Sequence, residues 1–263
     1  SPQTLPMVPG IEVTGTHAGK RYLASVSSGG YAQKAIAHEA ALIPIPDAVT
    51  DQQALCMLVQ GSTAWHLLKT MGSVKAGQTV VIHAAAGGVG TIAIQLAKMW
   101  GAKVIAVTSS QEKVDLAKSL GADEVVDARD SDLGKALRAA NGGRGVDLVL
   151  EMVGGTTFDQ SFLALGNFGK LITFGMASRT APTPIHPGSL MHGSKTVAGF
   201  WLANCFGKKE LMNDVIAELF ALVASGKLRP VIGSTYPLSK AADAHRAMLA
   251  RETTGKVALD PAL

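Results

Sequence analysis

The sequence has few cysteines and no long apolar run. Its two cysteines, Cys56 and Cys205, lie far apart in apolar surroundings, which excludes a disulfide framework and predicts buried free thiols in a reducing cytoplasm. No apolar run approaches the roughly 18 residues of a membrane span. The opening segment, SPQTLPMVPG, has the pattern of neither a signal peptide nor a transit peptide. We therefore expect a cytoplasmic protein without a membrane segment.

The chain also lacks dense positive charge and the residues of a metal centre. Its net charge is +4, but lysine and arginine are scattered, with no run longer than Lys208-Lys209 and no aromatic residues between them. This pattern argues against nucleic-acid binding as the main role and suits an anionic ligand. None of the seven histidines pairs with a cysteine at the spacing of metal ligands, so we expect no metal site.

Residues 79–200 alternate between apolar strands and helices. We expect six strands, at residues 79–82, 103–107, 124–127, 146–153, 170–175 and 196–202. The helices between them include residues 111–120, 132–140 and 158–165, with a turn at 166–169 and a loop at 181–188. Strands alternating with helices predict a six-stranded parallel sheet covered on both faces, which right-handed crossovers make a doubly wound α/β sheet.

Both ends of the chain differ from this middle part. Residues 10–45 contain short strand-like pieces, GIEVTG, RYLASV and YAQKAIA, separated by glycines. Residues 51–71, 210–225 and 239–250 are helical in pattern, and the chain closes with a strand at 255–259. We therefore expect two domains: residues 59–207 form the doubly wound domain, and residues 1–58 with 208–263 form a smaller β-rich domain.

The most informative stretch joins the first strand of the sheet to its helix. It reads TVVIHAAAGGVG, from Thr79 to Gly90. Gly87 and Gly90 match the second and third glycines of the dinucleotide-binding pattern G-x-G-x-x-G, and Ala85 stands at the first. A glycine at the second position lets a pyrophosphate approach the positive end of the helix. The alternative is a small-residue packing site, but the strand before and the helix after favour a nucleotide.

The residues after the second strand indicate which nucleotide binds. An NAD site needs an acidic residue about 20 positions beyond the glycines, to accept a hydrogen bond from the ribose 2′-OH. Thr108 and Ser109 occupy that place, and Lys113 follows one helical turn later. Hydroxyls and a cation hold a 2′-phosphate, so we predict NADPH. Ser109 can also cap the helix in a capping box with Glu112, and Lys113 can be a solvated surface lysine.

Segments along nearly the whole chain carry a family resemblance. In order, they are VPGIEVTGT, GGYAQ, GSTAWHLL, KAGQTVVIHAAAGGVG, SLGADEVVD, DLVLEMVGG, LITFGMAS, GFWL and TTGKVAL. They resemble the medium-chain dehydrogenase/reductase superfamily, in its zinc-free quinone oxidoreductase (ζ-crystallin-like) branch. The resemblance implies a Rossmann domain and an apparently incomplete GroES-like domain. Zinc-dependent relatives carry a G-H-E motif whose histidine ligates the metal, whereas this chain has Gly10-Ile11-Glu12, and isoleucine cannot bind zinc.

The resemblance also implies an activity and a set of cofactor contacts. The activity is hydride transfer from NADPH to a quinone or a conjugated enone, with no assigned catalytic side chain. The contacts it implies are Thr63 near the nicotinamide, Ala86, Gly87, Gly88 and Val89 at the pyrophosphate, Ser109 and Lys113 at the 2′-phosphate, Gly154, Phe174 and Gly175 in strand-end turns, Phe200, Trp201 and Leu202 beside the ring, and Lys256. For Phe200 and Trp201, core or interface packing is an equal alternative.

Partners and alternatives follow from the same resemblance. The edge strand Thr196–Phe200 implies a homodimer. Relatives usually begin several dozen residues before VPGIE and supply further barrel strands, so we expect an omitted segment or a partner to complete this domain. Ala128 stands where relatives often carry a tyrosine near the adenosine phosphate. Two other functions stay open: a low-turnover NADPH-binding structural or regulatory protein, crystallin-like or RNA-binding, and an enoyl-thioester reductase.

Overall fold

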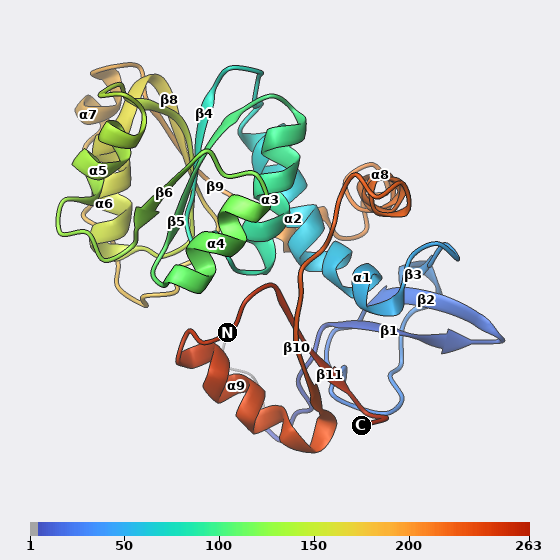
Figure 1. The fold of residues 1–263 in the computed structure, drawn as a ribbon. Coiled ribbons are helices and arrows are strands. Elements are labelled where there is room, and N and C mark those ends of the chain that lie inside the picture. Colours follow the sequence, from blue (N-terminus) through green and yellow to red (C-terminus); the bar gives the residue numbers. More distant parts are fainter. Residues whose placement is uncertain (1–4) are drawn as a thin grey trace. The chain divides into compact units, whose positions relative to one another are not determined.

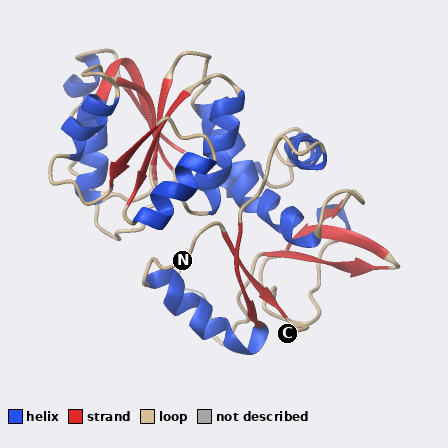
Figure 2. Cartoon of the chain, viewed as in Figure 1, coloured by secondary structure: helices blue, strands red, loops and turns tan. Residues whose placement is uncertain are grey.

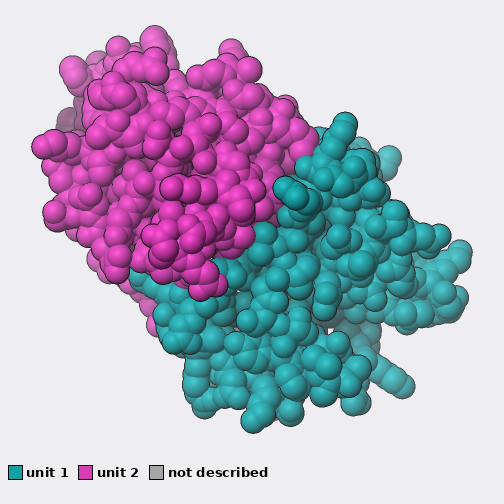
Figure 3. Space-filling model, viewed as in Figure 1, with its two compact units in different colours: residues 1–62, 205–263 teal, residues 63–204 magenta. Residues whose placement is uncertain are grey.

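The computed structural model describes residues 5–263. The chain forms two compact units (Figure 3): residues 1–62 with 205–263 make unit 1, and residues 63–204 make unit 2. Unit 2 holds the long run of alternating strands and helices, and unit 1 is assembled from both ends of the chain.

Unit 2 is built on a parallel sheet with the strand order β6-β5-β4-β7-β8-β9 (Figure 1, Figure 2). The strands are β4 (Thr79–Ile82), β5 (Lys103–Thr108), β6 (Glu124–Asp127), β7 (Val146–Glu151), β8 (Leu165–Thr173) and β9 (Thr196–Gly199). The order reverses between β4 and β7, and doubly wound sheets bind ligands at the carboxyl ends of the strands at this point. The predicted α/β class and doubly wound six-stranded sheet are confirmed.

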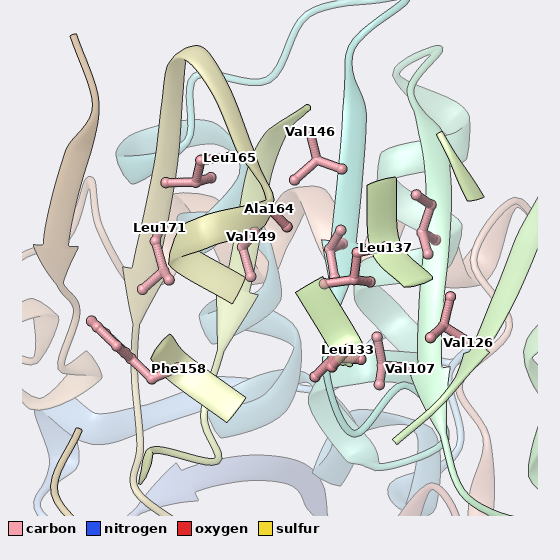
Figure 4. Packing of buried hydrophobic residues seen from close by; sticks show 12 residues of the cluster. Val107, Val126, Leu133, Leu137, Val146, Val149, Phe158, Ala164, Leu165 and Leu171 are labelled. Carbon is pink, nitrogen blue, oxygen red and sulfur yellow. The ribbon is translucent and has the colours of Figure 1, made fainter. Parts of the chain in front are cut away.

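Helices lie on both faces of this sheet, with α3 and α4 on one face and α5 and α6 on the other (Figure 1). The helices of unit 2 are α3 (Gly88–Met99), α4 (Gln111–Ser119), α5 (Leu133–Ala140), α6 (Gly155–Ala164) and α7 (Pro187–Met191). On the α5–α6 face, Leu137 and Phe158 pack with Val149 and Leu171 of the sheet (Figure 4). Burial of each such side chain contributes about 1.5–3 kcal/mol, so this layer holds the strands in register.

Unit 1 contains two small sheets. The strands β1 (Glu12–His17), β2 (Lys20–Ser25) and β3 (Leu42–Pro44) are antiparallel, and β10 (Ile232–Pro237) pairs in parallel with β11 (Lys256–Asp260). Its helices include α8 (Asn213–Ala224) and α9 (Ala241–Leu249), with short 3-10 turns at η1 (Glu39–Ala41) and η5 (Leu238–Lys240).

One long helical segment runs from Asp51 to Met71, as the sequence predicts. It comprises α1 (Asp51–Cys56), η2 (Met57–Gly61), α2 (Ser62–His66) and η3 (Leu67–Met71), in which η2 and η3 are π-helical turns. Thr50 and Gln53 form a reciprocal capping box at its start. This cap fixes where the helix begins.

Three expected elements differ in the structure. No strand forms at residues 31–37, because the N–H groups of Gly29, Gly30 and Tyr31 bond to the carbonyls of residues 8–10 in an irregular link. The turn expected at residues 166–169 is a bulge inside β8, where the pairing with β7 shifts register. The last strand ends at Gly199 rather than at residue 202, because the 3-10 turn η4 (Leu202–Cys205) follows.

Candidate nucleotide-binding site

Most of the predicted site residues of unit 2 follow the carboxyl ends of its strands, whereas Thr63 lies in α2 and Lys113 in α4. Residues 86–89 follow β4, Ser109 follows β5, Gly154 follows β7, Phe174 and Gly175 follow β8, and residues 200–202 follow β9. Because all six strands are parallel, these segments lie along one edge of the sheet. This is the edge at which doubly wound sheets bind nucleotides.

The turn between β4 and α3 has the geometry of an anion site. Ala84 adopts a left-handed conformation (φ 48°), and its carbonyl accepts a hydrogen bond from the N–H of Gly87 at 2.8 Å. Helix α3 begins at Gly88, with Gly87 as its N-cap and no side chain capping its N–H groups. A Cβ on Gly90 would lie 2.6 Å from both the Ala84 carbonyl oxygen and the Ala85 Cα, so only glycine fits there. The uncapped helix start therefore offers backbone donors to a phosphate.

His83 leads into this turn and is neutral. Its side chain is 2% exposed, and its Nε2 lies 2.8 Å from the hydroxyl of Ser161. Burial lowers the pKa of His83 to about 4. The positive potential at the turn therefore comes from backbone N–H groups and not from this imidazole.

Glu151 shapes the turn after β7. Its Oε1 accepts hydrogen bonds from the N–H groups of Val153 (2.7 Å) and Gly154 (3.0 Å), while Oε2 is buried without a hydrogen-bond partner among the described residues. Burial raises the pKa of Glu151. Gly154 has a φ of +81°, and a Cβ there would lie 2.8 Å from the Met176 side chain. Glu151 is not among the predicted site residues; its signal in the sequence is an acidic residue that ends an apolar strand before a glycine pair.

The aromatic residues after β8 and β9 have different surroundings. The Phe174 N–H donates to the Glu151 carbonyl at 2.9 Å, and Gly175 next to it is exposed. The Phe200 ring lies 5.6 Å from the ring of His66, in the same helix as the buried Thr63. Leu202 is buried.

Trp201 is 74% exposed, so the alternative of core packing is wrong for this residue. Its roles at an interface or beside the cofactor stay predictions.

A second feature is a cavity of about 400 Å³ that is lined by α4 and β6 and includes the carboxyl ends of β5 and β6. Ser109 lines this cavity, whereas Lys113 is half-buried on α4 and is not among its lining residues. The N-cap of α4 is Ser110, whose side chain makes no capping hydrogen bond. The expected capping box of Ser109 with Glu112 is therefore wrong, because the helix starts one residue later.

Lys256, the last predicted cofactor contact, lies in unit 1. Its ammonium group is buried in an ion pair with Glu12 and donates to Gln60 Oε1 at 3.1 Å. Burial is also the main cause that raises the pKa of the neighbouring Cys56 to about 12. Because Glu12 neutralises Lys256, this lysine adds little net attraction for an anionic cofactor, and its contact with one stays a prediction.

Unit 1 also contains a cavity of about 720 Å³, a volume suited to small ligands. Glu12, Tyr31, His245 and Lys256 are among its polar lining residues. The hydroxyl of Tyr31 lies 2.9 Å from Nε2 of His245, so the wall carries a linked pair of polar side chains.

Three further expectations from the sequence concern the cysteines, metal ligands and membrane helices. Both cysteines are free and buried, as predicted. Across residues 5–263, no three His, Cys, Asp or Glu side chains are grouped as metal ligands. Within the same range, no helix has the length and apolar character needed to cross a membrane.

Comparisons with known proteins give the following similarities. A family model described as "Zinc-binding dehydrogenase" matches residues 88–221. A quinone oxidoreductase of Pseudomonas aeruginosa is 33% identical over 254 residues, which are 96% of this chain and 78% of that protein. The solved structure of Escherichia coli quinone oxidoreductase complexed with NADPH is 31% identical, with a TM-score of 0.91 and coverage of 99% of this chain and 84% of that one. A mycobacterial protein complexed with NADPH is 37% identical, with a TM-score of 0.92 and the same two coverages.

Proposed function

Because the chain belongs to the quinone oxidoreductase branch of the medium-chain dehydrogenase/reductase superfamily, we propose that it transfers hydride from NADPH to a quinone or an α,β-unsaturated carbonyl compound. The observation that carries this proposal is the turn after β4. There, an uncapped helix N-terminus meets a glycine, Gly90, whose position leaves no room for a side chain. The two similar structures hold NADPH, which supports the same cofactor here.

For the pyrophosphate, the adenosine ribose and the nicotinamide of the cofactor, we propose contacts with residues of unit 2. Gly87, Gly88 and Val89 would hold the pyrophosphate through backbone N–H groups at the start of α3. Ser109, after β5, lies where the adenosine ribose binds in this fold. Thr63 and Phe200 are the proposed neighbours of the nicotinamide. When bound, the cofactor supplies the hydride, and the protein supplies position and a site from which water is excluded.

We propose that the reaction proceeds without zinc. Zinc-dependent members of the superfamily carry a metal-binding histidine in a G-H-E motif, and Ile11 stands in its place here. Isoleucine cannot bind a metal, and the adjacent Glu12 is paired with Lys256. An acceptor that is already activated by conjugation needs no Lewis acid. This restricts the proposed substrates to quinones and enones and disfavours simple alcohols.

A homodimer and a cytoplasmic location complete the proposal. The dimer rests on β9, which forms one edge of the sheet and has no partner strand on its outer side among residues 5–263. The cytoplasmic location rests on the two free cysteines, since a reducing compartment keeps such thiols from oxidation.

The test is to measure NADPH consumption by the purified protein with a panel of quinones and enones. We expect NADPH to be consumed with at least one acceptor, faster than NADH, and with no loss of rate after treatment with a chelator. Tight NADPH binding without consumption on any acceptor would instead support a structural or regulatory role. Activity that a chelator removes and zinc restores would contradict the metal-free reaction, and turnover confined to enoyl thioesters would identify a thioester reductase.

A further inference from the structure

We propose that Arg129 binds the 2′-phosphate of NADPH and thereby selects the phosphorylated coenzyme, an inference that rests on the cofactor proposed above. In this fold, an arginine near the end of the second strand of the Rossmann sheet accommodates that phosphate. The sequence pattern points to Lys113 for this role, and that contact stays a prediction. The geometry of unit 2 adds Arg129, which comes from the next strand.

A cavity lined by α4 and β6 includes the carboxyl ends of β5 and β6. It has a volume of about 400 Å³ and lies where a doubly wound sheet holds the adenosine ribose. Ser109, Ser110, Lys118 and Arg129 line it, and Lys113 is not among its lining residues. The cations at this cavity are therefore Arg129 and Lys118.

The pairing of β5 with β6 brings Arg129 to this place. The strands are parallel, with Thr108 opposite Asp127, and the Ala128 N–H donates to the Thr108 carbonyl at 2.8 Å. Arg129 follows Ala128 directly. It therefore lies beside the segment after β5 that is proposed to contact the ribose.

Asp127 orients the guanidinium without using all of its donors. Nε of Arg129 donates to Asp127 Oδ1 at 3.0 Å, and Nη2 donates to Oδ2 at 2.7 Å. A guanidinium has five N–H groups, so the remaining ones can bind phosphate oxygens while this pair stays intact. The Arg129 side chain is 71% exposed, so an incoming ligand can reach it.

The carboxylates around the cavity are the opposing charges. Asp123 is already bound by Lys98, at 2.8 Å for each carboxylate oxygen, and Asp127 by Arg129. Glu124 and Lys118 also line the cavity and balance each other in charge. A phosphate therefore meets a cavity without excess negative charge, in which Arg129 supplies the planar fork that suits phosphate.

The experiment measures binding by calorimetry of two probes, adenosine 2′,5′-bisphosphate and adenosine 5′-diphosphate, to the full chain. Arg129→Ala should weaken binding of the 2′,5′-bisphosphate by about tenfold to a hundredfold and leave binding of the 5′-diphosphate unchanged. Arg129→Lys should restore part of the affinity, because it keeps the charge. The exposed Arg144→Ala, which removes an arginine outside the cavity, serves as the control and should have little effect.

Three results would overturn the inference, and they distinguish its failure from the failure of the proposed function. If the wild-type protein prefers the 2′,5′-bisphosphate and Arg129→Ala retains that preference, the cofactor proposal stands and the assignment of Arg129 fails. If Arg129→Ala changes the binding of both probes equally, the assignment of Arg129 also fails, because such a change indicates a general effect on the fold. If the wild-type protein binds neither the 2′,5′-bisphosphate nor NADPH, both proposals fail.

Discussion

His83 is a buried titratable residue that precedes the phosphate-binding turn. Its pKa is about 4, below the ordinary 6.5, because burial disfavours the imidazolium. The folded state therefore holds the proton less tightly than the unfolded state. The contribution of His83 to the free energy of unfolding is fully present above pH 6.5. It is lost as the pH falls from 6.5 to 4, and the loss amounts to about 3 kcal/mol.

A His83→Gln variant tests this dependence, because glutamine does not titrate and can still bond to the hydroxyl of Ser161. We expect the free energy of unfolding of the wild-type protein to fall more steeply than that of the variant between pH 6.5 and pH 4. Urea unfolding at several pH values gives both curves, and the titration of other groups cancels in their difference. A difference that does not change with pH would contradict a neutral buried His83.

At the scale of elements, Gly90 sets the distance between α3 and the turn after β4. A Cβ at this position would lie 2.6 Å from backbone atoms of Ala84 and Ala85, which cannot move like a flexible side chain. Gly90→Ala should therefore displace the start of α3 and weaken NADPH binding by at least tenfold, with a loss of stability of about 1–3 kcal/mol.

The matched control is Gly15→Ala in β1, where a Cβ would have no atom within 4 Å. This control should leave NADPH affinity and the melting temperature close to those of the wild-type protein. Titration of cofactor fluorescence and thermal unfolding measure the two quantities. Wild-type affinity in the Gly90 variant would show that the close approach of helix and strand does not position the cofactor.

The elements that the sequence predicts well are those that local pattern determines. β4, β6 and the helical segment from Asp51 to Met71 have the expected bounds, because an apolar run or a capping residue marks each one. The strand expected at residues 31–37 fails because alternating pattern alone does not provide a partner strand. Its neighbours bond to residues 8–10 instead, and Ile36 is 96% exposed.

The residues of the candidate site also differ in how far local sequence predicts them. The glycines of the turn after β4 could be identified because their conformation and close contacts are encoded within a few residues. Glu151 and Arg129 were not identified in this way. Glu151 acts through hydrogen bonds in a turn whose shape is visible only in the structure, and Arg129 depends on the register of β5 with β6. Long-range register is not readable from one sequence.

At the scale of the whole molecule, the exposed edge of β9 bears on assembly. Phe200 donates its N–H to the Thr173 carbonyl in β8 at 2.8 Å. Because strand residues alternate in direction, Ala198 also faces β8, while the N–H groups of Val197 and Gly199 point outward. These outward groups are available to pair with the same strand of a second copy.

Gly199→Pro tests this pairing, because proline removes an outward donor and spares the bonds to β8. We expect the wild-type protein to sediment as a dimer at micromolar concentration and the proline variant to shift toward monomer. Gly199→Ala is the matched control: it keeps the N–H, its Cβ meets no atom within 4 Å, and it should remain a dimer. Circular dichroism checks that both variants are folded. A folded proline variant that stays dimeric would show that the two copies associate through another surface, since an edge without its donor cannot sustain a continuous sheet.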